Sequence, residues 1–147
     1  MEGLESAQKE LGKDAIVVSS DARSLTDLDA LAIRVMAEFG TGTFDLLFVN
    51  AGFSIPAPLD KVTEAIYDEM FNLNSKGPFF AVQKLAPLIN RGGAVALTTS
   101  VANVKGLPGQ STYGAATRHR ASGQSGFSVR HLSSSIYGGV RSVSRRP

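Results

Sequence analysis

The chain has 147 residues, of which 43% are hydrophobic and 19% charged. This length is enough for one globular domain and too short for two domains of ordinary size that each bury a hydrophobic core. The absence of cysteine excludes disulfide bonds and thiolate metal sites, and no apolar run reaches the roughly 18 residues that a membrane-spanning helix needs. The net charge of +2 is unevenly divided, because residues 1–116 hold all 13 acidic side chains and residues 117–147 hold none.

The first elements alternate between helix and strand patterns. Residues 2–11 show the spacing of a short amphipathic helix, and the β-branched run at 15–20 predicts a buried strand. Ser24 or Thr26 is placed to cap a second helix. The apolar face predicted for that helix consists of Leu28, Leu31, Val35, Met36 and Phe39.

The middle of the chain repeats this alternation. Residues 45–50 form a second apolar run, helical patterns follow at 63–71 and 74–89, and a short β-prone run at 94–99 predicts a third strand. Strands that alternate with helices are typical of a parallel sheet with right-handed crossovers. The sequence therefore predicts an α/β fold with three recognisable strands and flanking helices.

The composition changes after Ala116. Residues 117–147 contain eight serines, six arginines and four glycines, with no sustained helical or alternating pattern. We therefore divide the chain into an α/β domain at 1–116 and a basic tail at 117–147, for which we predict irregular, disordered structure. Binding of this tail to nucleic acid through phosphate contacts is a weaker alternative.

Two hydroxyl side chains are predicted to meet at one edge of the sheet. Strand 94–99 delivers Ser100 to its carboxyl end, and Tyr113 follows thirteen residues later, ahead of small residues that open a helix. On these residues the chain resembles the short-chain dehydrogenase/reductases, which are Rossmann-type oxidoreductases that use NAD or NADP. The resemblance covers about residues 4–116 and implies part of a doubly wound parallel sheet.

The resemblance implies catalytic roles for three polar side chains. Tyr113 would be the general acid or base, Ser100 would hydrogen-bond the substrate oxygen, and Asn74 would support a proton relay through water. Simpler interpretations remain open for two of them. Ser100 is otherwise a turn residue, and Asn74 is otherwise a helix cap, with Asn72 as a competing candidate.

The resemblance also implies contacts with NAD or NADP. Asp21 and the next backbone amide would meet the adenine ring, and the Asn-Ala-Gly motif after strand 45–50 would let a ribose approach the backbone. Asp21 is otherwise a turn or cap residue, and the motif otherwise a brace between strands. The glycine-rich turn that binds pyrophosphate in the family is absent. The acidic or basic residue that would select NAD or NADP in the family is absent with it, so no preference between the two is predicted. The expected cofactor-binding residues are Asp21, Ala22, Asn50, Ala51, Gly52 and Tyr113.

The family's active-site lysine corresponds to Thr117. An unperturbed tyrosine has a pKa near 10, about three units too high for a base at neutral pH, and an adjacent ammonium normally favours the phenolate. Thr117 carries no charge and cannot make the contact with the nicotinamide ribose that the resemblance implies for the lysine. Arg118 points elsewhere on a helix and Arg120 lies two turns from Tyr113, so neither is expected to replace the lysine.

Both ends of the chain depart from the family pattern. The family's strand order places two further strands between 15–20 and 45–50, so we expect a gap of about 10 Å unless these two pair directly. At the other end we expect a shift of reading frame near codon 117, because Thr117-Arg118 can be written ACA-AGG, which contains a lysine codon out of frame. The nucleotide sequence tests this hypothesis.

We therefore expect an oxidoreductase that moves hydride between NAD or NADP and a carbonyl or alcohol substrate, and that is impaired or inactive in this chain. The alternative is a non-catalytic remnant or interaction protein that self-associates through the helix at 74–89. The N-terminal residues lack the basic and apolar regions of a secretion signal, which indicates a cytoplasmic protein. We expect neither a metal site nor a nucleic-acid partner.

Overall fold

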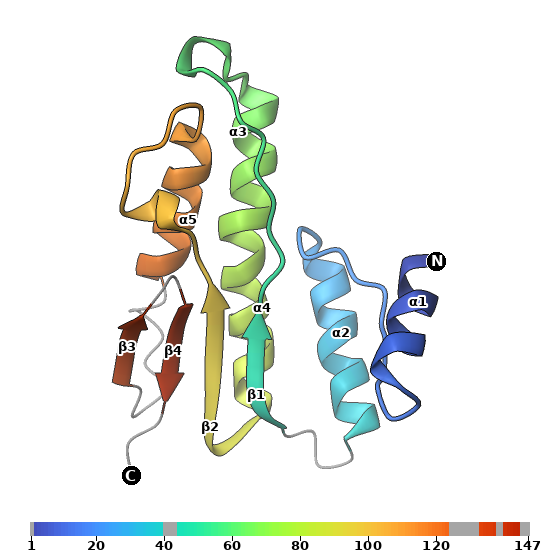
Figure 1. Cartoon of the computed structure of the whole chain (residues 1–147). Coiled ribbons are helices and arrows are strands. Elements are labelled where there is room, and N and C mark those ends of the chain that lie inside the picture. The colour runs from blue at the N-terminus through green and yellow to red at the C-terminus, as the bar shows by residue number, and fades with distance from the viewer. Residues whose placement is uncertain (1, 40–43, 124–132, 138–139, 145–147) are drawn as a thin grey trace.

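The computed structural model describes residues 2–39, 44–123, 133–137 and 140–144 (Figure 1). The last two ranges are described by their backbone alone. The helices and strands are α1 (Glu2–Leu11), α2 (Leu25–Glu38), β1 (Phe44–Val49), α3 (Glu64–Phe71), α4 (Gly77–Leu85), β2 (Ile89–Thr98), α5 (Ser111–Gly123), β3 (Ser133–Tyr137) and β4 (Val140–Ser144). Short 3-10 turns are η1 (Leu59–Lys61), η3 (Ala86–Leu88) and η4 (Val101–Asn103), and η2 (Asn72–Lys76) is a π-helical segment.

The strands form one sheet in the order β1-β2-β4-β3. β1 and β2 run parallel, with Val49 beside Leu97, whereas β4 is antiparallel to β2 and to β3. Since the parallel pair is joined through α3 and α4, the predicted α/β class with parallel strands is confirmed.

The predicted strand at 15–20 is wrong, because the described residues pair β1 with β2 alone and leave 15–20 outside the sheet. Ile16 and Val18 are 47% and 37% exposed. A strand forms only where a neighbouring strand accepts its backbone hydrogen bonds, and this run has no such neighbour. The alternative of direct pairing between 15–20 and the next strand is therefore also wrong.

The helix predicted at 63–71 and the next one form a nearly continuous rod, in which η2 joins α3 to α4. Thr63 caps its start by accepting a hydrogen bond from the Ile66 backbone at 3.2 Å. The second helix is shorter than predicted, since α4 ends at Leu85 and β2 already begins at Ile89. The strand predicted at 94–99 also begins earlier than expected, since Gly92 and Gly93 lie inside β2, near the point where the pairing with β1 changes register.

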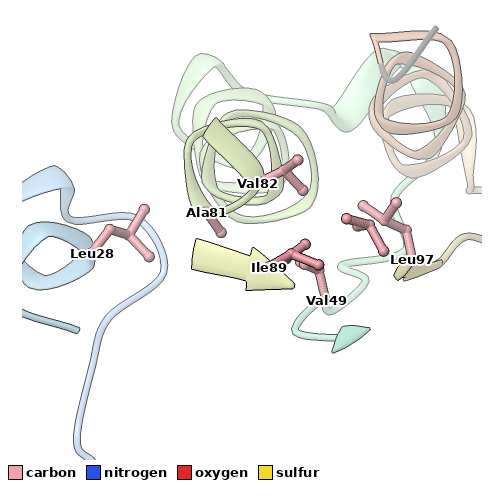
Figure 2. Packing of buried hydrophobic residues seen from close by; sticks show 7 residues of the cluster. Leu28, Val49, Ala81, Val82, Ile89 and Leu97 are labelled. Carbon is pink, nitrogen blue, oxygen red and sulfur yellow. The ribbon is translucent and has the colours of Figure 1, made fainter. Parts of the chain in front are cut away.

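The buried core lies between α2, α4 and the covered face of β1 and β2 (Figure 2). Its buried members are Leu28, Val49, Ala81, Val82, Ile89, Val95 and Leu97. Only part of the predicted apolar face of α2 reaches this core, because Met36 and Phe39 are more than half exposed. The opposite face of β1 is also open, as Leu46 and Phe48 are 59% and 56% exposed.

The segment after Ala116 is more regular than predicted. Helix α5 continues through Thr117 to Gly123, and strands β3 and β4 lie within the predicted irregular tail. The helix continues because Thr117 and Arg120 are buried against the rest of the domain, although neither side chain is apolar. Residues 124–132 and 145–147, with His131 among them, lie outside the described residues. None of the described helices is long and apolar enough to cross a membrane.

Because only one face of the sheet is covered, a leucine on that face should contribute more to the free energy of unfolding than a leucine on the open face. Leu97→Ala should lower the free energy of unfolding by about 2–5 kcal/mol, because Leu97 is only 1% exposed and its loss leaves a cavity. Leu46→Ala on the open face is the matched control and should change it by less than about 0.5 kcal/mol. Urea unfolding measures both, and equal losses would contradict the assignment of the covered face.

Candidate functional site

The segment that begins at Ser100 packs against α5, whose first turn carries Tyr113. Ser100 follows β2, and its hydroxyl accepts a hydrogen bond from the Ala102 backbone at 3.2 Å. The Ala102 carbonyl in turn packs against α5 so closely that a Cβ atom at Gly114 would lie 2.7 Å from it. Tyr113, next to Gly114 in the first turn of α5, is therefore held beside the segment that begins at Ser100. Both side chains are partly buried.

Asn74 braces the chain where it leaves β1. Its side chain is 1% exposed, and its oxygen accepts a hydrogen bond from the Phe53 backbone at 3.1 Å. Its amide donates to the carbonyls of Phe53 at 2.8 Å and Met70 at 3.0 Å. The alternative of a helix cap is wrong, because Asn74 lies inside η2 and binds a distant segment. Asn72, the competing candidate, stands at the start of η2.

The Asn50-Ala51-Gly52 motif forms the exposed turn after β1. The Asn50 side-chain oxygen accepts from the Thr98 hydroxyl at 2.7 Å, which ties the end of β1 to the end of β2. A Cβ atom at Gly52 would lie 2.8 Å from the Asn74 side-chain oxygen, so the Asn74 brace requires glycine there. The motif therefore joins β1 to β2 through Asn50, and its residues remain exposed to solvent at the carboxyl end of β1.

Thr117, at the position of the family's lysine, is 1% exposed. Its hydroxyl donates within its own helix, to the carbonyl of Tyr113 at 2.9 Å or to that of Gly114 at 3.2 Å. The side chain therefore satisfies its hydrogen bonding locally and brings no charge to the neighbouring tyrosine.

Arg120 is a site residue that the sequence does not reveal. Its side chain is 4% exposed, and its guanidinium donates to the carbonyls of Val49 at 2.6 Å and Ala51 at 3.1 Å. Burial lowers the pKa of Arg120 to about 10, an effect that the charge of Tyr113 partly offsets. The seven-residue spacing places Arg120 on the Tyr113 face of α5, but only the tertiary structure shows that it reaches β1.

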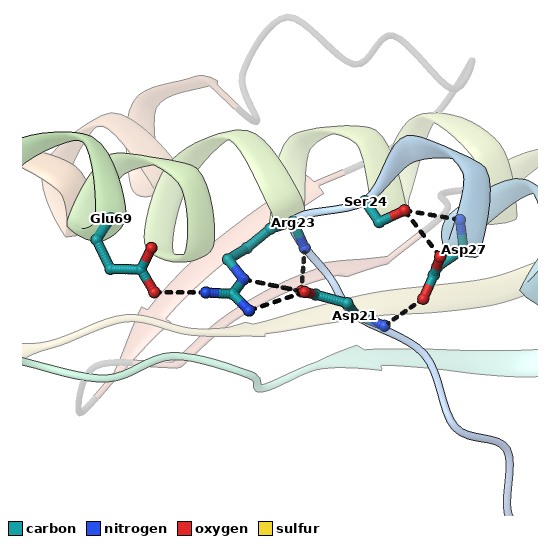
Figure 3. A network of polar contacts seen from close by, with 5 residues as sticks. All are labelled: Asp21, Arg23, Ser24, Asp27 and Glu69. Atoms are coloured by element: carbon teal, nitrogen blue, oxygen red, sulfur yellow. Dashed lines mark hydrogen bonds and ion pairs between the residues drawn. The ribbon is translucent and has the colours of Figure 1, made fainter. Parts of the chain in front are cut away.

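Asp21 belongs to a polar network that joins the segment before α2 to α3 (Figure 3). Its carboxylate accepts from the Arg23 guanidinium, at 2.8 Å from Nη2, and Arg23 also contacts Glu69 at 2.5 Å. The hydrogen bonds from the Arg23 side chain hold the pKa of Asp21 below its ordinary value. Ser24 caps α2, as one of the two predicted alternatives, by accepting from the Asp27 backbone at 3.1 Å.

Ala22 fixes where Asp21 sits relative to the rest of the site. A Cβ atom at Gly77 would lie 2.5 Å from the Ala22 carbonyl oxygen, so the backbone after Asp21 rests directly on the start of α4. The structure thus holds Asp21 and Ala22 on α4 and presents Asn50, Ala51 and Gly52 at the end of β1. These groups fit the two ends of an adenine-ribose unit only in part, because Arg23 already occupies the Asp21 carboxylate and Arg120 the Ala51 carbonyl.

A cavity of about 560 Å³ lies beside the first turns of α5. It is bounded by the loop that follows Ser100 and by Ala57, and it includes Lys105, Gly114 and Arg118. Within the residues that the structure describes, no three His, Asp or Glu side chains gather as a metal site. The lining of the cavity takes in Ala102 from the loop after Ser100 and Gly114 beside Tyr113, but neither Ser100 nor Tyr113 itself.

Comparison with known proteins relates these residues to one family. A sequence model described as short chain dehydrogenase matches residues 1–119. The oxidoreductase asL5 of Sarocladium schorii is 37% identical over 116 residues, which cover 78% of this chain and 46% of that protein. The hydroxynaphthalene reductase-like protein Arp2 of Metarhizium guizhouense is 32% identical over 103 residues, 69% of this chain and 38% of that protein. The chain thus spans less than half the length of these relatives.

Solved structures show the same fold. A short chain dehydrogenase from Burkholderia cenocepacia J2315, in complex with NADP, has a TM-score of 0.70 at 26% identity, over 80% of this chain and 48% of that one. A dehydrogenase/reductase from Sinorhizobium meliloti 1021 has a TM-score of 0.72 at 24% identity, over 82% of this chain and 48% of that one. The second likeness shows the fold alone.

The close approach of α5 to Ala102 can be tested with paired glycine substitutions. Gly114→Ala should lower the free energy of unfolding by about 1–3 kcal/mol, because the new methyl meets backbone that cannot rotate away. Gly106→Ala, where a Cβ meets nothing within 4 Å, is the control and should be neutral or stabilising. Thermal unfolding by circular dichroism measures both. A Gly114→Ala protein as stable as the control would show that α5 does not dock at Ala102.

Proposed function

This chain belongs to the short-chain dehydrogenase family, and from that premise we propose that it carries the substrate-side residues of an oxidoreductase. The proposed reaction moves hydride between NAD or NADP and a carbonyl or alcohol substrate. The observation that supports it is the packing of the segment after Ser100 on the first turn of α5, where the Ala102 carbonyl meets Gly114 next to Tyr113. We also propose a cytoplasmic location for this chain.

The proposed roles follow the chemistry of each side chain. Tyr113 exchanges a proton with the substrate oxygen, and Ser100 donates a hydrogen bond to that oxygen as charge develops on it. Asn74 supports the relay by fixing the turn after β1. NAD or NADP would supply the hydride when bound. Its adenine would meet Asp21 and Ala22, and its ribose would meet the turn at Asn50, Ala51 and Gly52.

The relatives suggest a substrate class for this site. Two of them are a hydroxynaphthalene reductase-like protein and the tetrahydroxynaphthalene reductase PfmaG of Pestalotiopsis fici, which is 30% identical over 104 residues. The cavity of about 560 Å³ beside α5 is large enough for a bicyclic aromatic ring. We propose a ring ketone of a hydroxynaphthalene as the first substrate to try.

We further propose that the activity is impaired, because Thr117 supplies neither the ammonium nor the ribose contact of a lysine. The purified chain should oxidise NADH or NADPH no faster than its Tyr113→Phe variant on a panel of aldehydes, ketones and hydroxynaphthalenes. Thr117→Lys should raise turnover by about tenfold or more, since general acid–base catalysis contributes at least that much. Wild-type turnover clearly above Tyr113→Phe would refute the impairment, and an unresponsive Thr117→Lys variant would favour a non-catalytic remnant.

A second proposal is a non-catalytic protein that self-associates, which the exposed apolar side chains of the described residues favour. Ile33 and Met36 on α2, and Leu46 and Phe48 on β1, are each more than half exposed. On this proposal, the helix at 74–89 adds the half-buried pair Phe79 and Phe80, whose rings meet edge to face at 5.3 Å.

Size-exclusion chromatography with circular dichroism tests this proposal. A folded self-associating chain should elute as an oligomer with a helical spectrum, and Phe48→Ser should shift it towards the monomer because it removes exposed apolar area. Thr26→Ser, at an exposed polar position in α2, is the control and should leave the elution unchanged. A folded monomer at all concentrations would contradict self-association.

A further inference from the structure

Exposed apolar side chains gather around the cavity beside α5. Leu59, Val104 and Leu107 all line it and are exposed, the first two by more than three-quarters of their surface. At about 560 Å³ the cavity lies within the size range of small-molecule sites, which are mostly apolar with a few polar groups that fix the ligand. The apolar part of this lining therefore fits the hydrophobic body of an organic ligand.

The charged side chains in the same lining are both cations. Lys105 comes from the loop after Ser100 and Arg118 from α5, and no acidic residue is among the lining residues. Neither cation forms an ion pair with a described residue. Asp60, which follows the lining residue Leu59 in the sequence, is paired with Lys61 at 3.3 Å. The cavity therefore presents two positive charges that no described acid offsets.

The start of α5 adds potential of the same sign. This helix has 13 residues and begins at Ser111, which also lines the cavity. Among the described residues, no acceptor is found for the backbone N–H groups of Ser111 and Thr112. The side-chain oxygen of Gln110, just before the helix, accepts instead from the Ser54 hydroxyl at 2.7 Å. Open N–H groups at the positive end of a helix dipole favour an anion, in support of the two cationic side chains.

The walls of the cavity are held by backbone contacts. The Ala57 N–H donates to the Gly109 carbonyl at 3.0 Å, and Gly109 has a φ of +71°, which favours glycine. On the other side, the Ala102 carbonyl packs against Gly114. A ligand would therefore enter a largely preformed site, which lowers the entropic cost of binding.

We propose that this cavity binds an organic anion, namely a carboxylate or phosphate monoester on a small hydrophobic body, whose acid group is bound by Lys105 and Arg118. The site goes beyond the proposed function, because its lining includes neither Ser100 nor Tyr113 and binding needs no hydride transfer. It also gives a role to Arg118, which the helical spacing turns away from Tyr113.

Ligand-observed proton NMR at neutral pH tests this proposal without a cofactor. The probes are 2-naphthoate, 2-naphthyl phosphate and 2-acetonaphthone, a neutral ketone of nearly the same size as the carboxylate. At least one of the two anions should bind about fivefold or more tightly than the ketone, and added potassium chloride should reduce that preference because salt screens the cations. The anion with the larger preference identifies which acid group the site takes.

Substitutions locate the site. Lys105→Gln and Arg118→Gln should each reduce the preference for the anion, and together they should abolish it while binding of the ketone is unchanged. Lys9→Gln, which removes the same charge from an exposed position on α1, is the control and should leave the preference intact. In the wild-type protein the amide signals of Gly106 and Gly109, which line the cavity, should shift when the preferred anion binds.

Three results would overturn the proposal: both anions binding no more tightly than the ketone, a preference that persists in the folded double variant, or an equal loss in Lys9→Gln. Circular dichroism shows whether each variant is folded. Failure of the oxidoreductase proposal would appear separately, as absent turnover in a protein that still binds the anion.

Discussion

The turn after β1 is the constraint on which the site depends. Four contacts fix it: Asn74 binds both backbone groups of Phe53, the Thr98 hydroxyl binds Asn50, and Arg120 binds the carbonyl of Ala51. Glycine at position 52 is the condition for the first of these, since any side chain would meet the Asn74 oxygen. These contacts join β1, η2, β2 and α5 at one point, so the carboxyl ends of both parallel strands are positioned together.

The catalytic candidates take their places from this arrangement. Asn74 occupies the middle of η2 because the π-helical segment turns its side chain towards the strand end, and π segments are frequent at functional sites. The segment after Ser100 and the first turn of α5, which carries Tyr113, are brought together by small residues, since Gly114 lets α5 lie on Ala102. The same small residues, Ala102 and Gly114, line the cavity beside α5.

Local patterns predict the parts of this fold that depend on near neighbours. The cap at Ser24, the helix at Glu2–Leu11 and the strand at Phe44–Val49 follow from residues a few positions apart. The prediction of a strand at 15–20 is wrong because a strand needs a neighbouring strand to pair with, and the local sequence pattern carries no information about such a neighbour. The role of Arg120 is missed because its contacts span 69 and 71 positions in the sequence. The end of α5 is missed because its buried face includes Thr117 and Arg120, which lower its apparent amphipathicity.

Amide hydrogen exchange at Phe53 tests the central claim most directly. The Phe53 N–H is bound to the Asn74 side-chain oxygen, so it should exchange far more slowly than an open loop amide. Asn74→Leu, which keeps the volume but removes the acceptor, should release that protection while the amides of β2 stay protected. A Phe53 amide that already exchanges as fast as an unstructured one in the wild-type protein would contradict the account.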